Sequence, residues 1–157
     1  MGGRRITTMA TALCVALSVG SAWAAENSPF VGRWRWNPSQ STIPTAEPVL
    51  KDFTVEISRA ESSRLSWSLT AVTSQGQPDV MTFDAPADGK FYPMDNNTTA
   101  AFRLTGGTLQ ATFNGPTGQT DALTCTLAPD RAMMTCRGVL SDNEGHTTNY
   151  VDVFDRM

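Results

Sequence analysis

The chain has 157 residues and a formal charge of −3, with 17% charged and 40% hydrophobic residues. This length fits one domain, and no block of like charge interrupts it. An acidic surface repels polyanions, so we expect neither nucleic acid nor an anionic membrane surface as a partner.

The first 24 residues have the three parts of a secretory signal peptide. Arg4 and Arg5 form a basic start, an apolar run covers residues 9–19, and small residues end the segment at Ala24. We expect cleavage between Ala24 and Ala25 and localisation in the periplasm or outside the cell. Two alternatives fit less well: the run is shorter than the about 20 apolar residues of a membrane anchor, and Leu13 stands before Cys14 where a lipoprotein signal needs a small residue.

Residues 25–157 then form a single domain with no membrane span. It retains Cys125 and Cys136, and an even pair in an exported protein indicates a disulfide. A hairpin that turns on residues 129–132 places these two cysteines directly opposite each other on adjacent antiparallel strands, within the reach of a disulfide. The alternative is a pair of unbonded, buried thiols.

Strand patterns with a period of two residues follow one another along this domain. Residues 30–37 begin the series, and apolar and polar side chains alternate through residues 53–58, 65–71 and 108–113. Residues that favour turns separate the runs: residues 37–39, 61–63, 74–78, 88–89, 95–97, 106–107, 114–116, 129–131 and 142–145.

These patterns predict an all-β fold, an antiparallel up-and-down meander of about ten strands. Closure into a small barrel removes the exposed edges most simply, and a two-sheet sandwich is the alternative. No window has a sustained helical period, so we expect at most one short helical turn, between Ser39 and Glu47.

The segment Phe30-Val31-Gly32-Arg33-Trp34 resembles the Phe-x-Gly-x-Trp opening of lipocalins and fatty-acid-binding proteins, and residues 153–156 resemble their last strand. The order of short motifs along the chain, including Asp88-Gly89-Lys90-x-Tyr92-Pro93, is similar to that of small exported bacterial lipocalin-like (calycin-like) β-barrel proteins described by fold alone. The resemblance implies a β-barrel that encloses a small apolar molecule.

Two departures from the fatty-acid-binding pattern stand out. Only residues 37–48 are available between the first two strands, where that family has a two-helix lid. Its last strand also carries an inward Arg-x-Tyr pair that holds the lipid carboxylate, and Asp152 and Phe154 occupy those positions here. The resemblance therefore does not imply fatty-acid carriage, and it disfavours an anionic ligand held in that way.

We find no catalytic constellation, no metal site and no cofactor motif in the sequence. His146 is the only histidine and lies beside a turn, which is typical of a solvated residue. Asp84, Asp88 and Asp95 lack the spacing of a calcium loop. Asp152 and Asp155 have opposite parity on one strand, so we expect them to face different sides and to pair with arginines such as Arg156.

Aromatic residues are the candidates for ligand binding: Trp34, Trp67, Tyr92, Phe102 and Tyr150. Such rings can line a cup and stack on a ligand. The alternative is that they fill the interior of a narrow barrel, with Trp34 plugging its base.

We predict that the protein binds a small apolar or weakly polar molecule non-covalently. The main alternative is an interaction or structural module of the cell envelope with a filled barrel and no ligand. An enzyme is a third interpretation, which would require Tyr92 or Tyr150 to be hydrogen-bonded to an inward carboxylate.

Overall fold

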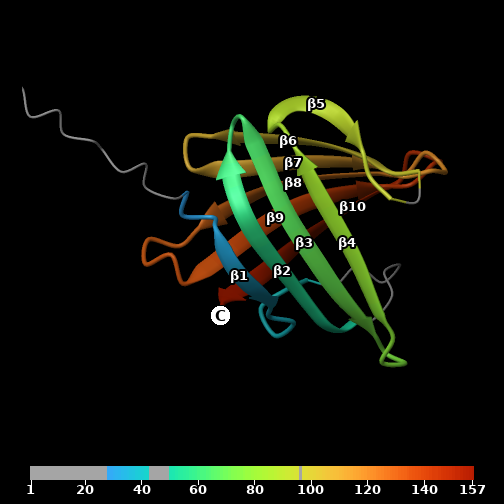
Figure 1. The fold of residues 1–157 in the computed structure, drawn as a ribbon. Helices are drawn as coiled ribbons and strands as arrows, with labels where there is room; N and C mark the ends of the chain where they lie inside the picture. The colour runs from blue at the N-terminus through green and yellow to red at the C-terminus, as the bar shows by residue number, and fades with distance from the viewer. Residues whose placement is uncertain (1–27, 43–49, 96) are drawn as a thin grey trace, which may run out of the picture.

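The computed structural model describes residues 28–42, 50–95 and 97–157, and within them it contains ten β-strands and no helix. The number and kind of elements agree with the prediction (Figure 1). The strands are β1 (Gly32–Trp36), β2 (Leu50–Glu61), β3 (Arg64–Thr73), β4 (Pro78–Ala85), β5 (Asp88–Pro93), β6 (Thr99–Thr105), β7 (Thr108–Asn114), β8 (Thr120–Leu127), β9 (Met133–Ser141) and β10 (Thr147–Arg156).

All ten strands belong to one antiparallel sheet in the order β4-β3-β2-β1-β10-β9-β8-β7-β6-β5. The pairing of β1 with both β2 and β10 joins the first and last strands and curls the sheet into a nearly closed barrel (Figure 1). Within the described pairings, β4 and β5 are the two ends of the sheet. The fold is therefore the predicted barrel and not a sandwich of two separate sheets.

The β8–β9 hairpin has the predicted register. Cys125 lies opposite Cys136, and Leu123 lies opposite Gly138. The two cysteines form a disulfide and are both buried. Arg131 has a φ of 59° in the connecting turn, where the chain must reverse within a few residues.

The connection between β4 and β5 differs from the prediction. We expected Asp88 and Gly89 to break the chain between strands, but both residues belong to β5. A register shift lies between Asp88 and Phe91, so the two residues bend the strand in place of ending it. Gly89 has a φ of 82°, and the Lys90 N–H donates to Asp88, which stabilises this bend.

After β1 the chain turns and runs back along β10. The Thr42 N–H donates to the Val151 carbonyl, and Ser41 Oγ accepts from the Val153 N–H. These contacts place residues 41 and 42 beside β10, on the edge that pairs with β1 farther along the strand. The predicted helical turn lies partly in residues 43–47, outside the described residues, as do the signal peptide and its cleavage site.

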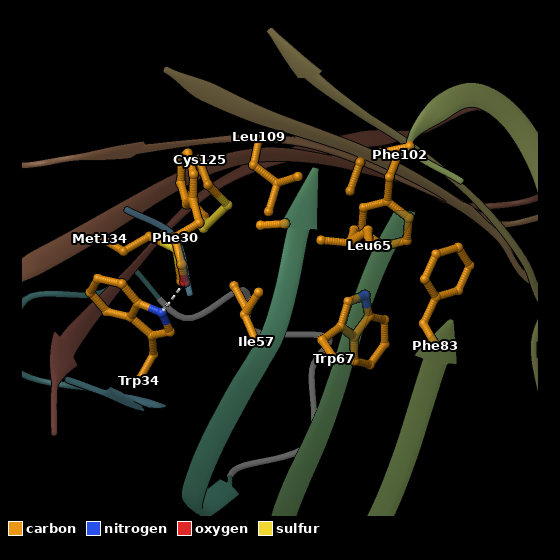
Figure 2. Close-up of a cluster of buried hydrophobic side chains, with 14 of the residues drawn as sticks. Phe30, Trp34, Ile57, Leu65, Trp67, Phe83, Phe102, Leu109, Cys125 and Met134 are labelled. Carbon is orange, nitrogen blue, oxygen red and sulfur yellow. Dashed lines mark hydrogen bonds between the residues drawn. A yellow bond between two sulfur atoms is a disulfide. The ribbon is translucent and has the colours of Figure 1, made fainter. Parts of the chain in front are cut away.

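Apolar side chains from almost every strand meet at the end of the barrel where β1 begins (Figure 2). Trp34, Phe30 and Leu65 are almost completely buried there. Cys125, Met134 and Leu109 approach them from the other half of the sheet. This end of the barrel is filled, so we call it the base. In the part of the chain that the structure covers, no helix has the length and apolar character needed to cross a membrane.

Candidate ligand-binding site

Trp34 and Arg156 close the base of the barrel. Trp34 Nε1 donates to the Phe30 carbonyl over 2.9 Å, and the Arg156 guanidinium lies 4.1 Å from the centre of the Trp34 ring. Arg156 also donates to the carbonyl oxygens of Pro29, Val31 and Arg131. The end of β10 thus holds residues 29–31 in place at the base, and Trp34 is part of a structural plug.

An aromatic layer lies above the base. Trp67 stacks on Phe83 with 5.9 Å between the ring centroids. The centroid of the Phe102 ring lies 6.0 Å from that of Trp67 and 4.6 Å from that of Phe83. Phe113 continues the series with an edge contact to Phe102 at 5.6 Å. The structure therefore brings Trp67 and Phe102 together, but as tightly packed neighbours that are 8% and 4% exposed.

Among the described side chains, Trp67 Nε1 is a buried donor without a hydrogen-bond partner. Figure 2 shows the indole nitrogen on the side of the ring that faces Leu65 and Phe102, inside the apolar cluster. Such a donor costs about 1–3 kcal/mol of stability. A Phe or Leu at this position would avoid that cost.

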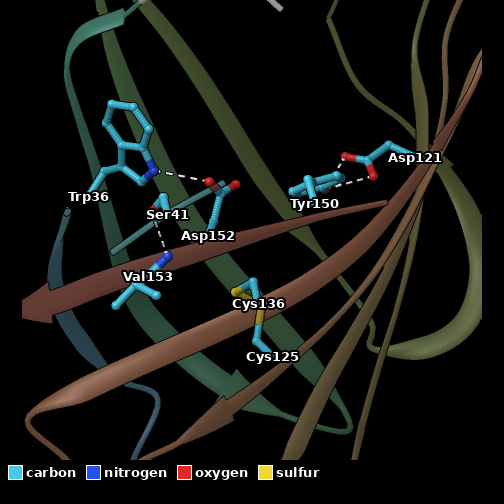
Figure 3. Close-up of a disulfide and its surroundings, with 8 residues drawn as sticks. All are labelled: Trp36, Ser41, Asp121, Cys125, Cys136, Tyr150, Asp152 and Val153. Carbon is cyan, nitrogen blue, oxygen red and sulfur yellow. Dashed lines mark hydrogen bonds between the residues drawn. A yellow bond between two sulfur atoms is a disulfide. The ribbon is translucent and has the colours of Figure 1, made fainter. Parts of the chain in front are cut away.

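Tyr150 points into the barrel and reaches across a neighbouring strand. Its hydroxyl lies 2.7 and 2.8 Å from the two carboxylate oxygens of Asp121 (Figure 3). Tyr150 is on β10 and Asp121 on β8, so the ring crosses β9 at Gly138, its partner in the ladder. A Cβ atom at Gly138 would lie 2.1 Å from the ring. The missing side chain makes the contact sterically possible.

Asp152 lies farther along β10 on the same inward face, opposite Cys136. It accepts a hydrogen bond of 3.0 Å from Trp36 Nε1 (Figure 3). Asp155 faces outward and accepts from Asn37 Nδ2. The predicted opposite orientation of the two acids is confirmed. The expected ion pairs with Arg156 are wrong, because its guanidinium donates to backbone carbonyls at the base.

Tyr92 lies apart from the Tyr150–Asp121 pair. It is half-buried on β5, and its hydroxyl donates to Asp88 over 3.1 Å. Desolvation raises the pKa of Tyr92, and the hydrogen bond to Asp88 raises it further. The backbone N–H of Lys90 lowers the pKa of Asp88. This pair stabilises the bend of β5.

Asp142, Glu144 and His146 form one group that sequence reasoning missed. Their ligand atoms lie within 4.8 Å of one another in the turn between β9 and β10, and all three residues are exposed. His146 Nδ1 lies 2.9 Å from Asp142, and this bond lowers the pKa of Asp142. The residues could ligate a cation, but their internal hydrogen bonds already explain their arrangement. The sequence contained a signal for this group, because the three residues stand two positions apart within one predicted turn.

Asp121 and Trp36 were also missed as members of an interior polar set. The signal was present for Asp121, since it shares its parity with the inward Leu123 and Cys125. Alternation shows which face a residue occupies but not which residue of another strand it meets. The Trp36–Asp152 pair is 116 positions apart in sequence.

Two shallow hollows lie on the outer surface near the last residues of the chain. One of about 590 Å³ lies between Pro29, Val31 and the β8–β9 turn. The other, of about 610 Å³, lies beside Trp36 and Pro38. Neither is an enclosed cavity lined by the aromatic candidates.

No protein-family model matches the chain, and no curated protein sequence matches it. Solved structures do. A point mutant of the fluorescent protein UnaG superimposes with a TM-score of 0.55 at 13% identity, covering 82% of this chain and 96% of the other. Apo Caenorhabditis elegans lipid binding protein 8 gives a TM-score of 0.54 at 10% identity, with the same coverages.

The likeness shows the fold alone. It confirms the all-β barrel of ten antiparallel strands, and it leaves the identity of the ligand-binding residues as a prediction.

Proposed function

We propose that this protein is an exported carrier that holds a small apolar or weakly polar molecule inside its barrel. The main support for this proposal is the composition of the inner face above the base. Half-buried apolar residues lie there together with a few polar groups that hydrogen bonds hold in place. Ligand pockets are typically lined in this way. The name of the neighbour lipid binding protein 8 supports the same class of function.

Export is supported by the signal-like first 24 residues and by the disulfide. Disulfides persist mainly in oxidising compartments such as the periplasm or the extracellular space. N-terminal sequencing of protein recovered from its own source tests this part. We expect the chain to begin at Ala25.

Binding is tested with Nile red, a neutral apolar dye, and with two substitutions on adjacent residues of β8. Leu123 faces inward and is half-buried, whereas Ala122 is exposed. Leu123→Trp should fill the interior and weaken dye binding about tenfold or more, while Ala122→Trp should leave it unchanged. Near-ultraviolet circular dichroism checks that both variants fold.

Native mass spectrometry of the purified protein is the complementary measurement. A co-purifying small molecule supports a carrier. If the purified protein contains no bound molecule and also does not bind Nile red, the proposal is contradicted. That result supports the alternative of an envelope module with a filled barrel.

The Tyr150–Asp121 pair favours a second candidate, an enzyme in which Tyr150 transfers a proton to or from the bound molecule. A carboxylate that fixes a phenol is the arrangement that such a general acid or base requires. Mass spectrometry of the ligand after incubation separates the two. A carrier returns the molecule unchanged, whereas an enzyme converts it and Tyr150→Phe does not.

A further inference from the structure

The indole nitrogen of Trp67 is a hydrogen-bond donor that the folded chain does not use. Among the side chains that the structure describes, Trp67 Nε1 is the one buried nitrogen or oxygen without a partner. Trp34 and Trp36, by contrast, both use their indole N–H, which donates to the Phe30 carbonyl and to Asp152 respectively. A buried donor left unpaired costs stability, so its presence calls for an explanation.

Trp67 lies where the filled base of the barrel meets a more open interior. Along the inner face of β3, Leu65 and Trp67 are buried, whereas Leu69 is half-buried. The inner face of β7 has the same gradient, from buried Leu109 to half-buried Phe113. Inward side chains that are only half-buried border space that the protein itself does not fill. The Trp67 ring is therefore at the floor of that space.

The N–H of Trp67 points across the interior. Figure 2 shows the nitrogen on the side of the ring that faces Leu65 and Phe102. Phe102 belongs to β6, and β3 and β6 are not neighbours in the sheet. The donor thus faces the opposite wall of the barrel and not the adjacent strand, which is the direction from which a bound molecule can supply an acceptor.

The surroundings of the donor decide which acceptor it suits. The neighbouring side chains Leu65, Phe83 and Phe102 are apolar, and no Asp, Glu, Lys, Arg or His of the described residues is buried. A carboxylate at this floor would lose its hydration without meeting a buried cation, which costs more than one hydrogen bond returns. A hydroxyl would bring a donor of its own into the same apolar surroundings. A carbonyl oxygen brings an acceptor and no charge.

We propose that Trp67 Nε1 is the polar anchor of the carried molecule and that the barrel selects uncharged carbonyl compounds, such as ketones and esters, with an apolar body. This inference rests on the proposed carrier function and specifies its ligand class. The carbonyl end enters first, the ring of Phe102 rotates aside, and the apolar body lies along the half-buried residues above the floor. The unpaired donor of the empty protein then becomes paired in the complex.

The test compares three ligands that share a naphthalene ring and carry different groups at the same ring position: acetylnaphthalene, isopropenylnaphthalene and naphthoate. The first has a carbonyl oxygen where the second has a methylene group of nearly the same size, and the third has a carboxylate. Each is titrated into the full mature protein by isothermal calorimetry. We expect acetylnaphthalene to bind about tenfold more tightly than isopropenylnaphthalene, and naphthoate to bind most weakly.

Nuclear magnetic resonance observes the proposed hydrogen bond directly. Protein with isotope-labelled tryptophan gives one indole N–H signal for each ring, and hydrogen bonding moves such a proton downfield. Acetylnaphthalene should move the Trp67 signal downfield, whereas isopropenylnaphthalene, which brings the same aromatic ring, should not. This measurement uses the wild-type chain and does not depend on the folding of a variant.

Two substitutions locate the donor. Trp67→Phe removes the unpaired N–H, so it should abolish the preference for acetylnaphthalene over isopropenylnaphthalene, while the space it leaves affects both ligands alike. Trp36→Phe is the matched control, because it removes an indole whose N–H already donates to Asp152. It should retain the preference. Urea denaturation checks that both variants fold.

The outcomes are distinguishable. Equal affinities for acetylnaphthalene and isopropenylnaphthalene, or tightest binding of naphthoate, would overturn the ligand class and leave the carrier function standing. So would a Trp67 signal that is already downfield in the empty protein and that acetylnaphthalene does not move, because an enclosed water would then satisfy the donor. Failure of all three ligands while Nile red still binds would also overturn the inference. Failure of Nile red as well would contradict the carrier function itself.

Discussion

Gly138 is the residue on which the polar interior depends. Its φ is not in the left-handed region, so glycine is required there for space and not for backbone freedom. The ring of Tyr150 occupies that space and carries its hydroxyl to Asp121.

Gly138→Ala should therefore displace the Tyr150 ring and lower the free energy of unfolding by about 1–3 kcal/mol, the usual cost of overpacking. Urea denaturation measures the loss. In a Tyr150→Ala background the same substitution should cost much less, because the obstructing ring is gone. Equal costs in both backgrounds would contradict the steric explanation.

The ionisation of Asp84 makes the stability of the protein depend on pH. Hydrogen bonds from Arg64 and then Ser66 lower the pKa of Asp84 from 3.8 to about 2. A lowered folded-state pKa contributes stability above the ordinary carboxyl pKa, and that contribution disappears as the pH falls through the folded-state value.

Wild-type protein should thus be slightly more stable than Asp84→Asn at about pH 6, and the difference should shrink between about pH 4 and pH 2. Thermal unfolding across this range is the measurement. The effect is small because the ion pair is exposed. A difference that stays constant down to pH 2 would contradict the role of the carboxylate charge.

The β8–β9 hairpin is the element that the sequence specified most completely. Two cysteines, a turn sequence and alternating apolar residues all agree on one register, and the ladder has that register. The disulfide closes a short loop, with a sequence separation of 11.

Replacing both Cys125 and Cys136 by Ala should lower the free energy of unfolding by about 2–3 kcal/mol. Urea denaturation of the double variant and of reduced wild-type protein provides the comparison. Similar losses would assign the effect to the cross-link, whereas a loss confined to the double variant would assign it to packing. Because both cysteines are buried, reductant should act on the native protein slowly.

Other elements were specified less well. Asp88 and Gly89 are typical of a turn, yet the chain uses them to bend β5. Local sequence favours the positive φ at Gly89 but does not distinguish a turn from a bulge. That choice depends on whether neighbouring strands continue to pair on either side.

At the scale of the whole molecule, the barrel is closed by β1 and interrupted between β4 and β5. Each of these two strands has one paired neighbour in the described ladder, whereas β8 and β9 have two. Exposed apolar side chains also occur on both, Val80 on β4 and Phe91 on β5.

Amides of β4 and β5 that face away from their partners should exchange with deuterium faster than amides of β8 and β9. Native-state exchange followed by mass spectrometry or NMR tests this. Equal protection in the two pairs would show that β4 and β5 pair with each other in solution or are covered by another chain.

The sequence by itself determined the all-β class, the approximate boundaries of most strands, the two faces of several strands and the disulfide. All of these follow from local signals: the two-residue period of a strand, the φ preferences of turn residues, and the short distance between Cys125 and Cys136. Only the tertiary structure decided that Trp34 and Arg156 together fill the base. It also decided that Tyr150 meets Asp121 and that Asp152 meets Trp36. Those contacts join strands that are distant in sequence, so they depend on the curvature and closure of the barrel, which no local pattern encodes.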